Sequence, residues 1–168
     1  MSRPAETGSR LWPRVMSADA AVRLITSGDR VYLHEVAMTP HELLDALVRR
    51  AHEVSDVEVV SLHTEGAAPH VAPGLARNIR HNALFVGANV RDAVNDGRAD
   101  YTPVFLSEVP ALFASGRLAL DVALLQVSPP DRHGFCRLGT SIACARAAVD
   151  AATTVIALVN PRVPRTLG

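Results

Sequence analysis

The chain has 168 residues, of which 48% are hydrophobic and 20% charged, a composition typical of a soluble globular domain. Its 17 basic residues are all arginine and balance 17 acidic ones, so the net charge is zero and nothing indicates nucleic-acid binding. Because lysine does not occur, the chain cannot form a Schiff base through a lysine amine.

The two cysteines, Cys136 and Cys144, are too few for a disulfide scaffold, and no CxxC or His/Cys spacing indicates a metal site. We expect two reduced thiols in a cytoplasmic protein. No apolar run approaches the ~18 residues of a membrane span. Residues 1–13 are polar and lack the apolar core of a signal peptide.

Residues 1–16 are expected to form a loose N-terminal arm, and residues 17–168 a single domain. The first predicted elements are a helix over 18–25 capped by Ser17, a strand over 30–36, a helix from Pro40 and a strand over 57–62. The helix start reads as a capping box, with Thr39 at N-cap, Pro40 at N1 and Glu42 at N3. Leu43 and Leu47 should pack this helix on the sheet.

The second half continues the alternation. We expect a strand over 83–86, a helix over 90–94, a helix over 107–114 capped by Ser107, a strand over 121–127, a helix over 142–152 and a strand over 154–159. The apolar runs 121–127 and 154–159 read as buried strands. Together with 57–62 they should be neighbouring and mostly parallel. The predicted fold class is therefore α/β, a mainly parallel open sheet flanked by helices.

Ligands of open α/β sheets bind beyond the carboxyl ends of the strands, where four predicted loops fall. Loop 37–40 leads into a helix N-terminus, which suits an oxyanion. Loop 63–66 offers a histidine, a threonine, a carboxylate and a glycine, and the prolines and glycines of 128–139 imply a sharply bent loop. The fourth loop is 160–164. Each loop alone could equally be a plain polar connection, and no Walker lysine, GxGxxG or GxSxG occurs.

Several ordered segments are more specific. They are VMSADAAVRLITSGDRVYL (15–33), HTEGAAP (63–69), FVGANVR (85–91), GRADYTP (97–103), LSEVP (106–110), DVALLQVSPPDRHGFCRLGTS (121–141) and VNP (159–161) with Pro164. As an ordered set they resemble the N-terminal domain of the acetyl-CoA hydrolase/4-hydroxybutyrate CoA-transferase family, a Rossmann-like half. The resemblance covers about residues 15–168.

The resemblance implies exchange of CoA between an acyl-CoA and a short-chain carboxylate through a glutamyl-CoA intermediate. CoA is then a substrate, and no cofactor is expected to be bound permanently. The family's nucleophilic glutamate lies in a second α/β domain, so no catalytic residue is assigned here. Glu65 is interpreted as a loop residue, although its His-Thr-Glu triplet is similar to the one around that nucleophile. The implied substrate and CoA pocket residues are Thr39, Pro40, His63, Glu65, Gly66, Asn89, Asp131, Gly134 and Asn160.

Three functions remain open from the sequence. The chain could be the N-terminal half of a CoA-transferase, a stand-alone non-catalytic acyl-CoA-binding or regulatory domain, or one subunit of a split transferase. The expected partners are an acyl-CoA, a short-chain carboxylate and a second catalytic domain or further copies of the chain. The acyl group could be acetate, butyrate, 4-hydroxybutyrate or propionate. By itself the chain is expected to be inactive.

Overall fold

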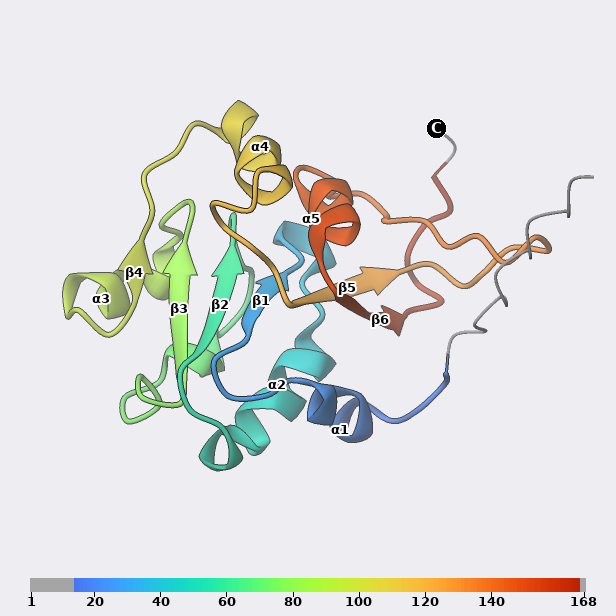
Figure 1. The fold of residues 1–168 in the computed structure, drawn as a ribbon. Helices are drawn as coiled ribbons and strands as arrows, with labels where there is room; N and C mark the ends of the chain where they lie inside the picture. Colours follow the sequence, from blue (N-terminus) through green and yellow to red (C-terminus); the bar gives the residue numbers. More distant parts are fainter. Residues whose placement is uncertain (1–13, 167–168) are drawn as a thin grey trace, which may run out of the picture.

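The computed structural model describes residues 14–166 as a twisted sheet between two layers of helices (Figure 1). The predicted arm over 1–16 lies almost entirely outside the described residues. The main elements are α1 (Ala18–Ala21), β1 (Arg30–Leu33), α2 (His41–Arg49), β2 (Val57–Ser61), β3 (Ile79–Ala83), α3 (Ala88–Asn95), β4 (Asp100–Tyr101), α4 (Val109–Ala114), β5 (Val122–Val127), α5 (Ala145–Ala151) and β6 (Thr154–Val159). Within the described range, no helix is long and apolar enough to cross a membrane.

All six strands are parallel, in the order β4-β3-β2-β1-β5-β6, which confirms the predicted fold class. The predicted adjacency is only partly right. β5 pairs with β6, but β1 lies between β2 and β5, pairing Val31 with Val59 on one side and with Val122 on the other. The chain therefore builds one half of the sheet outward from β1 and then returns to build the other half.

The two faces of the sheet carry separate cores, because alternate residues of a strand point to opposite faces. On one face, Val31 and Leu33 pack with α1 and α2. On the other, Tyr32 packs with α4 and α5, and its ring meets Phe113 edge-on at 5.9 Å between centroids. Figure 1 shows these helix pairs on opposite sides of the sheet, with α3 beside β4. Both faces of the central strands are thus shielded from water.

Helix α2 confirms the packing prediction and contradicts the capping one. Leu43 and Leu47 are buried in the core with the sheet. However, Pro40 and not Thr39 is the N-cap, and no side chain caps the helix. Thr39 ends a preceding 3₁₀ turn, Val36–Met38, and its hydroxyl donates to the Val36 carbonyl at 2.9 Å. That local bond uses the group that would have capped the helix.

Two other element predictions are wrong in position, and one element was not predicted. The strand expected over 83–86 is instead β3, Ile79–Ala83. Its buried residues include the polar His81 and Asn82, so the sequence lacks the apolar pattern typical of a buried strand. The two-residue β4 was not predicted. Before α4, a 3₁₀ turn, Leu106–Glu108, takes the place of a helix capped by Ser107, and the Phe105 N–H donates to the Glu108 carboxylate at 3.4 Å.

Strand β6 was predicted to be buried and is instead the edge of the sheet. Only Ile156 is buried, whereas Val155 is 45% exposed and Val159 is 51% exposed. The apolar run is real, but nothing among residues 14–166 covers its outer face. We call the exposed row Val155, Ala157 and Val159 the β6 stripe.

Candidate functional site at the carboxyl edge of the sheet

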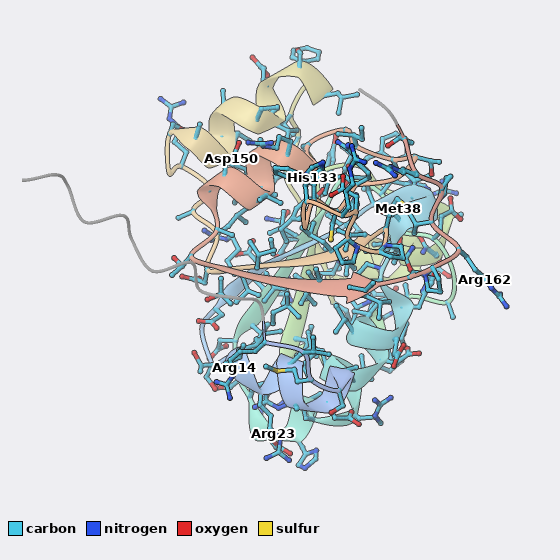
Figure 2. The ribbon with its side chains drawn as sticks, turned by 90° about the vertical axis from the view of Figure 1, so that its right-hand side faces the viewer. Arg14, Arg23, Met38, His133, Asp150 and Arg162 are labelled. Atoms are coloured by element: carbon cyan, nitrogen blue, oxygen red, sulfur yellow. The ribbon has the colours of Figure 1, made fainter. Side chains whose placement is uncertain are left out.

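The strand order reverses between β1 and β5, and this reversal fixes where a ligand crevice can form. In open α/β sheets, ligands bind outside the carboxyl ends of the strands at such a switch point, because the connections leave in opposite directions there. The segments after β1, β2, β3, β5 and β6 all emerge at this edge, since every strand is parallel. In Figure 2, His133 and Arg162 lie well away from Arg14, which precedes α1, and from Arg23, which lies in the turn after it.

The first group of side chains follows β2, and we call it the His63 cluster: Thr39, His63, Thr64, Glu65, Gly66 and Asn89. His63 Nε2 lies 3.2 Å from Glu65 Oε1, and the Glu65 N–H donates to Thr39 Oγ1 at 3.4 Å. The Glu65 side chain is 56% exposed. A solvent-facing carboxylate beside an imidazole can bind or position a polar ligand.

Asn89, in the first turn of α3, holds this loop in shape. Its Nδ2 lies 3.1 Å from the Thr64 carbonyl, the Thr64 hydroxyl and the Gly66 carbonyl, and its two hydrogens are shared among these three acceptors. Just before it, Gly87 leaves room for His63, because a Cβ there would lie 2.9 Å from His63 Cε1. The donors of Asn89 Nδ2 are thus already paired with acceptors of the protein, and they fix the loop that carries Glu65.

Position 66 requires a glycine, because its backbone φ is positive and because His41 lies close to where a Cβ would be. Its φ is +87°, and a Cβ there would lie 2.8 Å from His41 Cε1. Gly66→Ala is expected to cost about 1–2 kcal/mol of unfolding free energy from the left-handed backbone, plus the displacement of His41. Urea unfolding measures this cost.

Gly74→Ala is the matched control, because Gly74 also has a positive φ of +92° but meets nothing within 4 Å. The loss in Gly66→Ala should exceed that in Gly74→Ala, and adding His41→Ala should remove the excess. Equal losses in the two single variants would show that the contact with His41 is unimportant.

Between β1 and α2, Val36 adopts a φ of +52°, an outlier for a β-branched residue. Its N–H donates to the His63 carbonyl at 2.8 Å, which ties the loop after β1 to the loop after β2. Such strain persists only where surrounding structure enforces it, and it gathers at functional sites. The switch point is therefore built with a strained backbone directly beside the His63 cluster.

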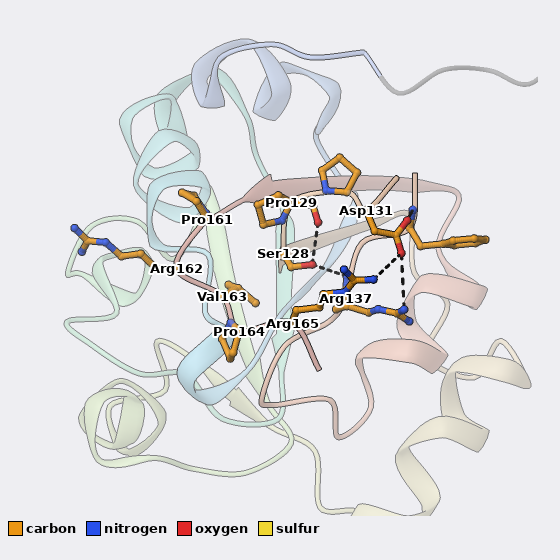
Figure 3. Close-up of a pocket in the computed structure, with 11 residues that line it drawn as sticks. Ser128, Pro129, Asp131, Arg137, Pro161, Arg162, Val163, Pro164 and Arg165 are labelled. Atoms are coloured by element: carbon orange, nitrogen blue, oxygen red, sulfur yellow. Dashed lines mark hydrogen bonds and ion pairs between the residues drawn. The ribbon is translucent and has the colours of Figure 1, made fainter. Parts of the chain in front are cut away.

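A second group of residues forms a pocket after β5 and β6, which we call the arginine pocket (Figure 3). Its volume is about 440 Å³. The lining comes from two segments, Ser128, Pro129, Pro130, Asp131, Phe135 and Arg137 after β5, and Pro161, Arg162, Val163, Pro164 and Arg165 after β6. Ser128 holds the two ends of the first segment together, since its hydroxyl accepts a hydrogen bond from the backbone N–H of Arg137 at 2.9 Å.

Asp131 is the carboxylate of this pocket. It accepts hydrogen bonds from the backbone N–H groups of His133 at 2.8 Å and Phe135 at 3.0 Å, and lies 3.5 Å from Arg165 and 3.9 Å from Arg137. The Phe135 N–H is the main cause that lowers the pKa of Asp131, followed by the His133 N–H, with a smaller effect of the Arg165 charge. The Asp131 carboxylate is therefore an anion that fixes its own loop and positions the two arginine side chains.

Two predicted site residues serve as turn residues. Gly134, with φ at +85°, donates its N–H to the Asp131 carbonyl at 2.9 Å and closes the turn. Asn160 accepts from the Arg162 N–H at 2.9 Å and donates to Gln126 Oε1 at 3.1 Å, fixing the segment after β6. Both shape the pocket walls.

Met38 connects the two groups. A Cβ on Gly139 would lie 2.5 Å from the Met38 sulfur and 3.0 Å from Val163, so Met38 and Val163 pack directly on the glycine backbone. Thr39, the next residue, belongs to the His63 cluster. The predicted set therefore falls into two groups joined through Val36–Met38, and Pro40, which belongs to neither group, is buried.

The sequence did not single out Met38, Arg137 or Arg165, and it indicated Gly139 only as a glycine of the bent loop 128–139. Arg137 and Gly139 lie inside the quoted segment 121–141, and that was the available signal. Three of the seven histidines, His34, His70 and His81, are buried.

His34 ties the loops after β1 and β5 together. Its Nε2 donates to the Ser141 carbonyl at 2.7 Å, and its Nδ1 accepts from the Gln126 N–H at 3.3 Å. Burial lowers the pKa of His34, against the opposing effect of these two hydrogen bonds. A neutral ring is the form that satisfies one donor and one acceptor at once.

Glu35, the residue after His34, is a fully buried carboxylate beneath the switch point. The Tyr32 hydroxyl donates to Glu35 Oε2, and the Cys144 thiol lies 3.7 Å from that hydroxyl. Glu35 Oε1 has no hydrogen-bond partner among residues 14–166. Burial raises the pKa of Glu35 to about 7, and burial also raises the pKa of Cys144 to about 12.

Within the described part of the chain, no group of three or more His, Cys, Asp or Glu side chains is arranged to hold a metal ion. The fold and its carboxyl edge together define an α/β protein with polar side chains beside a topological switch point and a pocket after β5 and β6. The side chains there are carboxylates, imidazoles, amides and guanidinium groups, of which all but the carboxylates can donate hydrogen bonds to a ligand.

Comparison with known proteins gives the family. The acetyl-CoA hydrolase/transferase N-terminal domain matches residues 4–168, and the chain belongs to this family. It is 44% identical over 155 residues to the 4-hydroxybutyrate coenzyme A transferase of Clostridium kluyveri, covering 92% of this chain and 36% of that protein. It is 41% identical over 155 residues to the succinyl-CoA:acetate/propanoyl-CoA:succinate CoA transferase of Fasciola hepatica, covering 90% of this chain and 32% of that one.

Among solved structures, the 4-hydroxybutyrate CoA-transferase of Porphyromonas gingivalis superposes with a TM-score of 0.76 at 31% identity, over 92% of this chain and 35% of that chain. The chain thus spans about a third of the length of these relatives and corresponds to their N-terminal part. The resemblance drawn from the sequence is confirmed.

Proposed function

We propose that this chain is the N-terminal part of a CoA-transferase that moves CoA between an acyl-CoA and a short-chain carboxylate, of the 4-hydroxybutyrate, acetate or butyrate type. The observation that carries the proposal is the pair of polar groups at the switch point of a family fold: the His63 cluster and the arginine pocket. The named relatives use different acids, 4-hydroxybutyrate in one and succinate, acetate and propanoate in the other, so the acyl group is set by residues that vary between them.

In the proposed reaction a glutamate carboxylate attacks the thioester carbonyl, and the CoA thiolate leaves as an acyl-glutamyl anhydride forms. The thiolate then attacks the glutamyl carbonyl and releases the first acid, which leaves a glutamyl-CoA thioester. The acceptor carboxylate attacks that thioester, the CoA thiolate leaves, and a new anhydride forms. The thiolate then attacks the acyl carbonyl of this anhydride, which gives the new acyl-CoA and releases the glutamate carboxylate. Donors must face each oxyanion, and water must be kept away from the anhydride.

The nucleophile is proposed to come from a second domain outside this sequence. Glu65 is 56% exposed and pairs with His63, which suits a residue that contacts substrate at the crevice wall. The β6 stripe supports a covering partner on the neighbouring edge, either that second domain or a further copy of the chain. We also propose that residues 17–168 form one domain, and that the protein works in the cytoplasm, where the free thiols Cys136 and Cys144 would stay reduced.

The test is a mixing experiment. The chain is combined with the separately produced remainder of the Clostridium kluyveri relative, beginning after the stretch that matches this chain. Transfer of CoA from butyryl-CoA to acetate is expected only when both parts are present. The chain alone should give no turnover, because it would lack the nucleophile and leave the crevice open to water. Turnover by the chain alone that disappears in Glu65→Gln would overturn this assignment and make Glu65 the nucleophile.

A further inference from the structure

Three buried polar side chains beneath the switch point form a chain of contacts that the proposed reaction does not use. The Tyr32 hydroxyl donates to Glu35 Oε2 and lies 3.7 Å from the Cys144 sulfur, and all three residues are at most 1% exposed. We call them the Glu35 cluster. Tyr32 belongs to β1 and Glu35 follows it, whereas Cys144 is the N-cap of α5. The cluster therefore joins the centre of the sheet to the helix that follows the loop after β5.

The charge state of Glu35 decides how well this contact is satisfied. Its Oε1 is buried with no hydrogen-bond partner among residues 14–166. A neutral carboxyl with its proton on Oε2, directed to the Tyr32 oxygen, leaves Oε1 only as an unpaired acceptor. An ionised carboxylate leaves half of its charge, on Oε1, without a donor in the core, which is far more costly. Ionisation thus favours any movement that lets water reach Oε1.

Glu35 is the member of the cluster that titrates near neutral pH. The titratable side chains that face it are Tyr32 from β1 and Cys144 from α5. Burial raises the pKa of Glu35 to about 7, with the hydrogen bond from Tyr32 acting in the opposite direction. Burial also raises the pKa of Tyr32 far above its usual value and that of Cys144 to about 12, so both stay neutral in this range. The adjacent His34 ring contacts the Ser141 carbonyl instead, and burial lowers its pKa.

The start of α5 is the side of the cluster that can move. Tyr32 is held on both sides, because β1 pairs with β2 and with β5. By contrast, α5 has seven residues and no side-chain cap, and Ala143, just before Cys144, has a φ of +25°. Strain of this kind persists only where surrounding contacts enforce it. Ile142, one residue earlier, is 48% exposed. Releasing Cys144 therefore disturbs less structure than moving β1.

We propose that ionisation of Glu35 releases the start of α5 from Tyr32 and loosens the end of the loop after β5. The segment that moves is 141–144, which His34 holds through the Ser141 carbonyl at 2.7 Å. Between pH 4.5 and about 7 the closed form binds a proton that an opened, hydrated carboxyl does not. Opening therefore becomes about tenfold more favourable per pH unit in this range, and the effect levels off above pH 7.

The experiment measures how fast the Cys144 thiol reacts with N-ethylmaleimide between pH 5 and 8, with each site followed by peptide mass spectrometry. Cys136 is exposed and serves as the reference thiol within the same molecule. The rate at Cys144 relative to Cys136 should rise at least about tenfold more in wild type than in Glu35→Gln. The shift from 4.5 to about 7 sets an upper limit of about 300-fold. Glu53→Gln, at an exposed position after α2, is the matched control and should follow wild type.

Hydrogen–deuterium exchange separates this local release from unfolding of the whole chain. After correction for intrinsic exchange, the amides of residues 141–148 should lose protection about tenfold or more between pH 5 and 8. They should also stay at least about tenfold less protected than the amides of α2 and β2.

Three results would overturn the proposal. They are a rise in Cys144 labelling that is the same in Glu35→Gln, protection of 141–148 that does not change with pH, and equal protection in 141–148, α2 and β2. The last result would show that Cys144 is reached only by global unfolding. Should Glu35→Gln fail to fold, the exchange pattern of the wild-type chain decides alone.

Discussion

Below pH 6.5 two buried histidines that contact each other are expected to make a destabilising contribution to the folded protein. His70 Nε2 lies 3.0 Å from His81 Nδ1, and both rings are buried. Burial lowers the pKa of His81 to about 4, and burial together with the charge of His81 lowers the pKa of His70 well below its usual value. His70 Nδ1 is buried with no partner among the described residues, so no acceptor awaits a proton there.

The direction in which stability changes with pH follows from the number of protons bound by the folded and unfolded states. Between the ordinary pKa near 6.5 and the folded value near 4, the unfolded chain binds a proton at His81 and the folded chain does not, so stability falls as pH falls. For His81 alone the loss at pH 5 is about 2 kcal/mol, and His70 adds to it. By itself this contribution would lower the Tm of a chain of this length by about 4–8 °C. In wild type the buried Glu35 acts in the opposite direction over the same pH range, because its carboxyl becomes neutral as pH falls.

Thermal unfolding of wild type and His81→Gln between pH 7.5 and 5 measures the effect. His81→Gln removes one titrating ring and keeps an amide for His70, so its Tm should depend less on pH. His52→Gln, at an exposed position in the turn after α2, is the control and should follow wild type. Parallel curves for His81→Gln and wild type would contradict the assignment of acid sensitivity to this pair.

Glu35→Gln is expected to stabilise the protein at alkaline pH by about 2–3 kcal/mol. The pKa of Glu35 is raised from 4.5 to about 7 by burial, with the hydrogen bond from Tyr32 acting in the opposite direction. Between those values the folded chain binds a proton that the unfolded chain does not, so stability falls as pH rises. The cost is complete above pH 7, where a charge lies in the core beside the unpaired Oε1.

Urea unfolding at pH 5.0, 7.0 and 8.5 tests this result. The gain in Glu35→Gln should be largest at pH 8.5 and small at pH 5.0, because the carboxyl is neutral in the folded state there. Glu53→Gln in the turn after α2 is an exposed control with no expected pH trend of this kind. A gain that is the same at all three pH values would contradict a pH-dependent cost of Glu35. In the Glu35→Gln background the acid loss from the histidines should be steeper.

The parallel α/β fold followed from sequence because its central strands are apolar on both faces. The run Val122–Val127 is buried at nearly every position, as its composition indicated. The same rule failed for β6, since an apolar run at a sheet edge looks identical to one at the centre. β3 was misplaced for the opposite reason: its buried His81 and Asn82 interrupt the apolar pattern. Strand order depends on contacts between distant segments, which periodicity does not contain.

For the candidate site, sequence identified the loops but not what each side chain does. Loops at strand ends were predictable because parallel strands share one edge, and Glu65 and Asp131 lie there. The residue type of Asn89 did not reveal that the hydrogens of its side-chain amide are shared among three acceptors of the neighbouring loop. The buried Glu35 and the unpaired Arg137 Nε depend on tertiary packing alone, so neither had a local signal.

Because β1 is the central strand, the two sides of the site form with different loop-closure entropies when the chain folds. Pairing Val31 with Val59 closes a loop of 28 residues, whereas pairing Val31 with Val122 closes one of 91 residues. Loop-closure entropy makes the second pairing more costly by about 1 kcal/mol. The His63 cluster follows from the near half and the arginine pocket from the far half. The crevice is therefore complete only once the chain has returned to β1, and its far wall depends on the longest-range contact in the sheet.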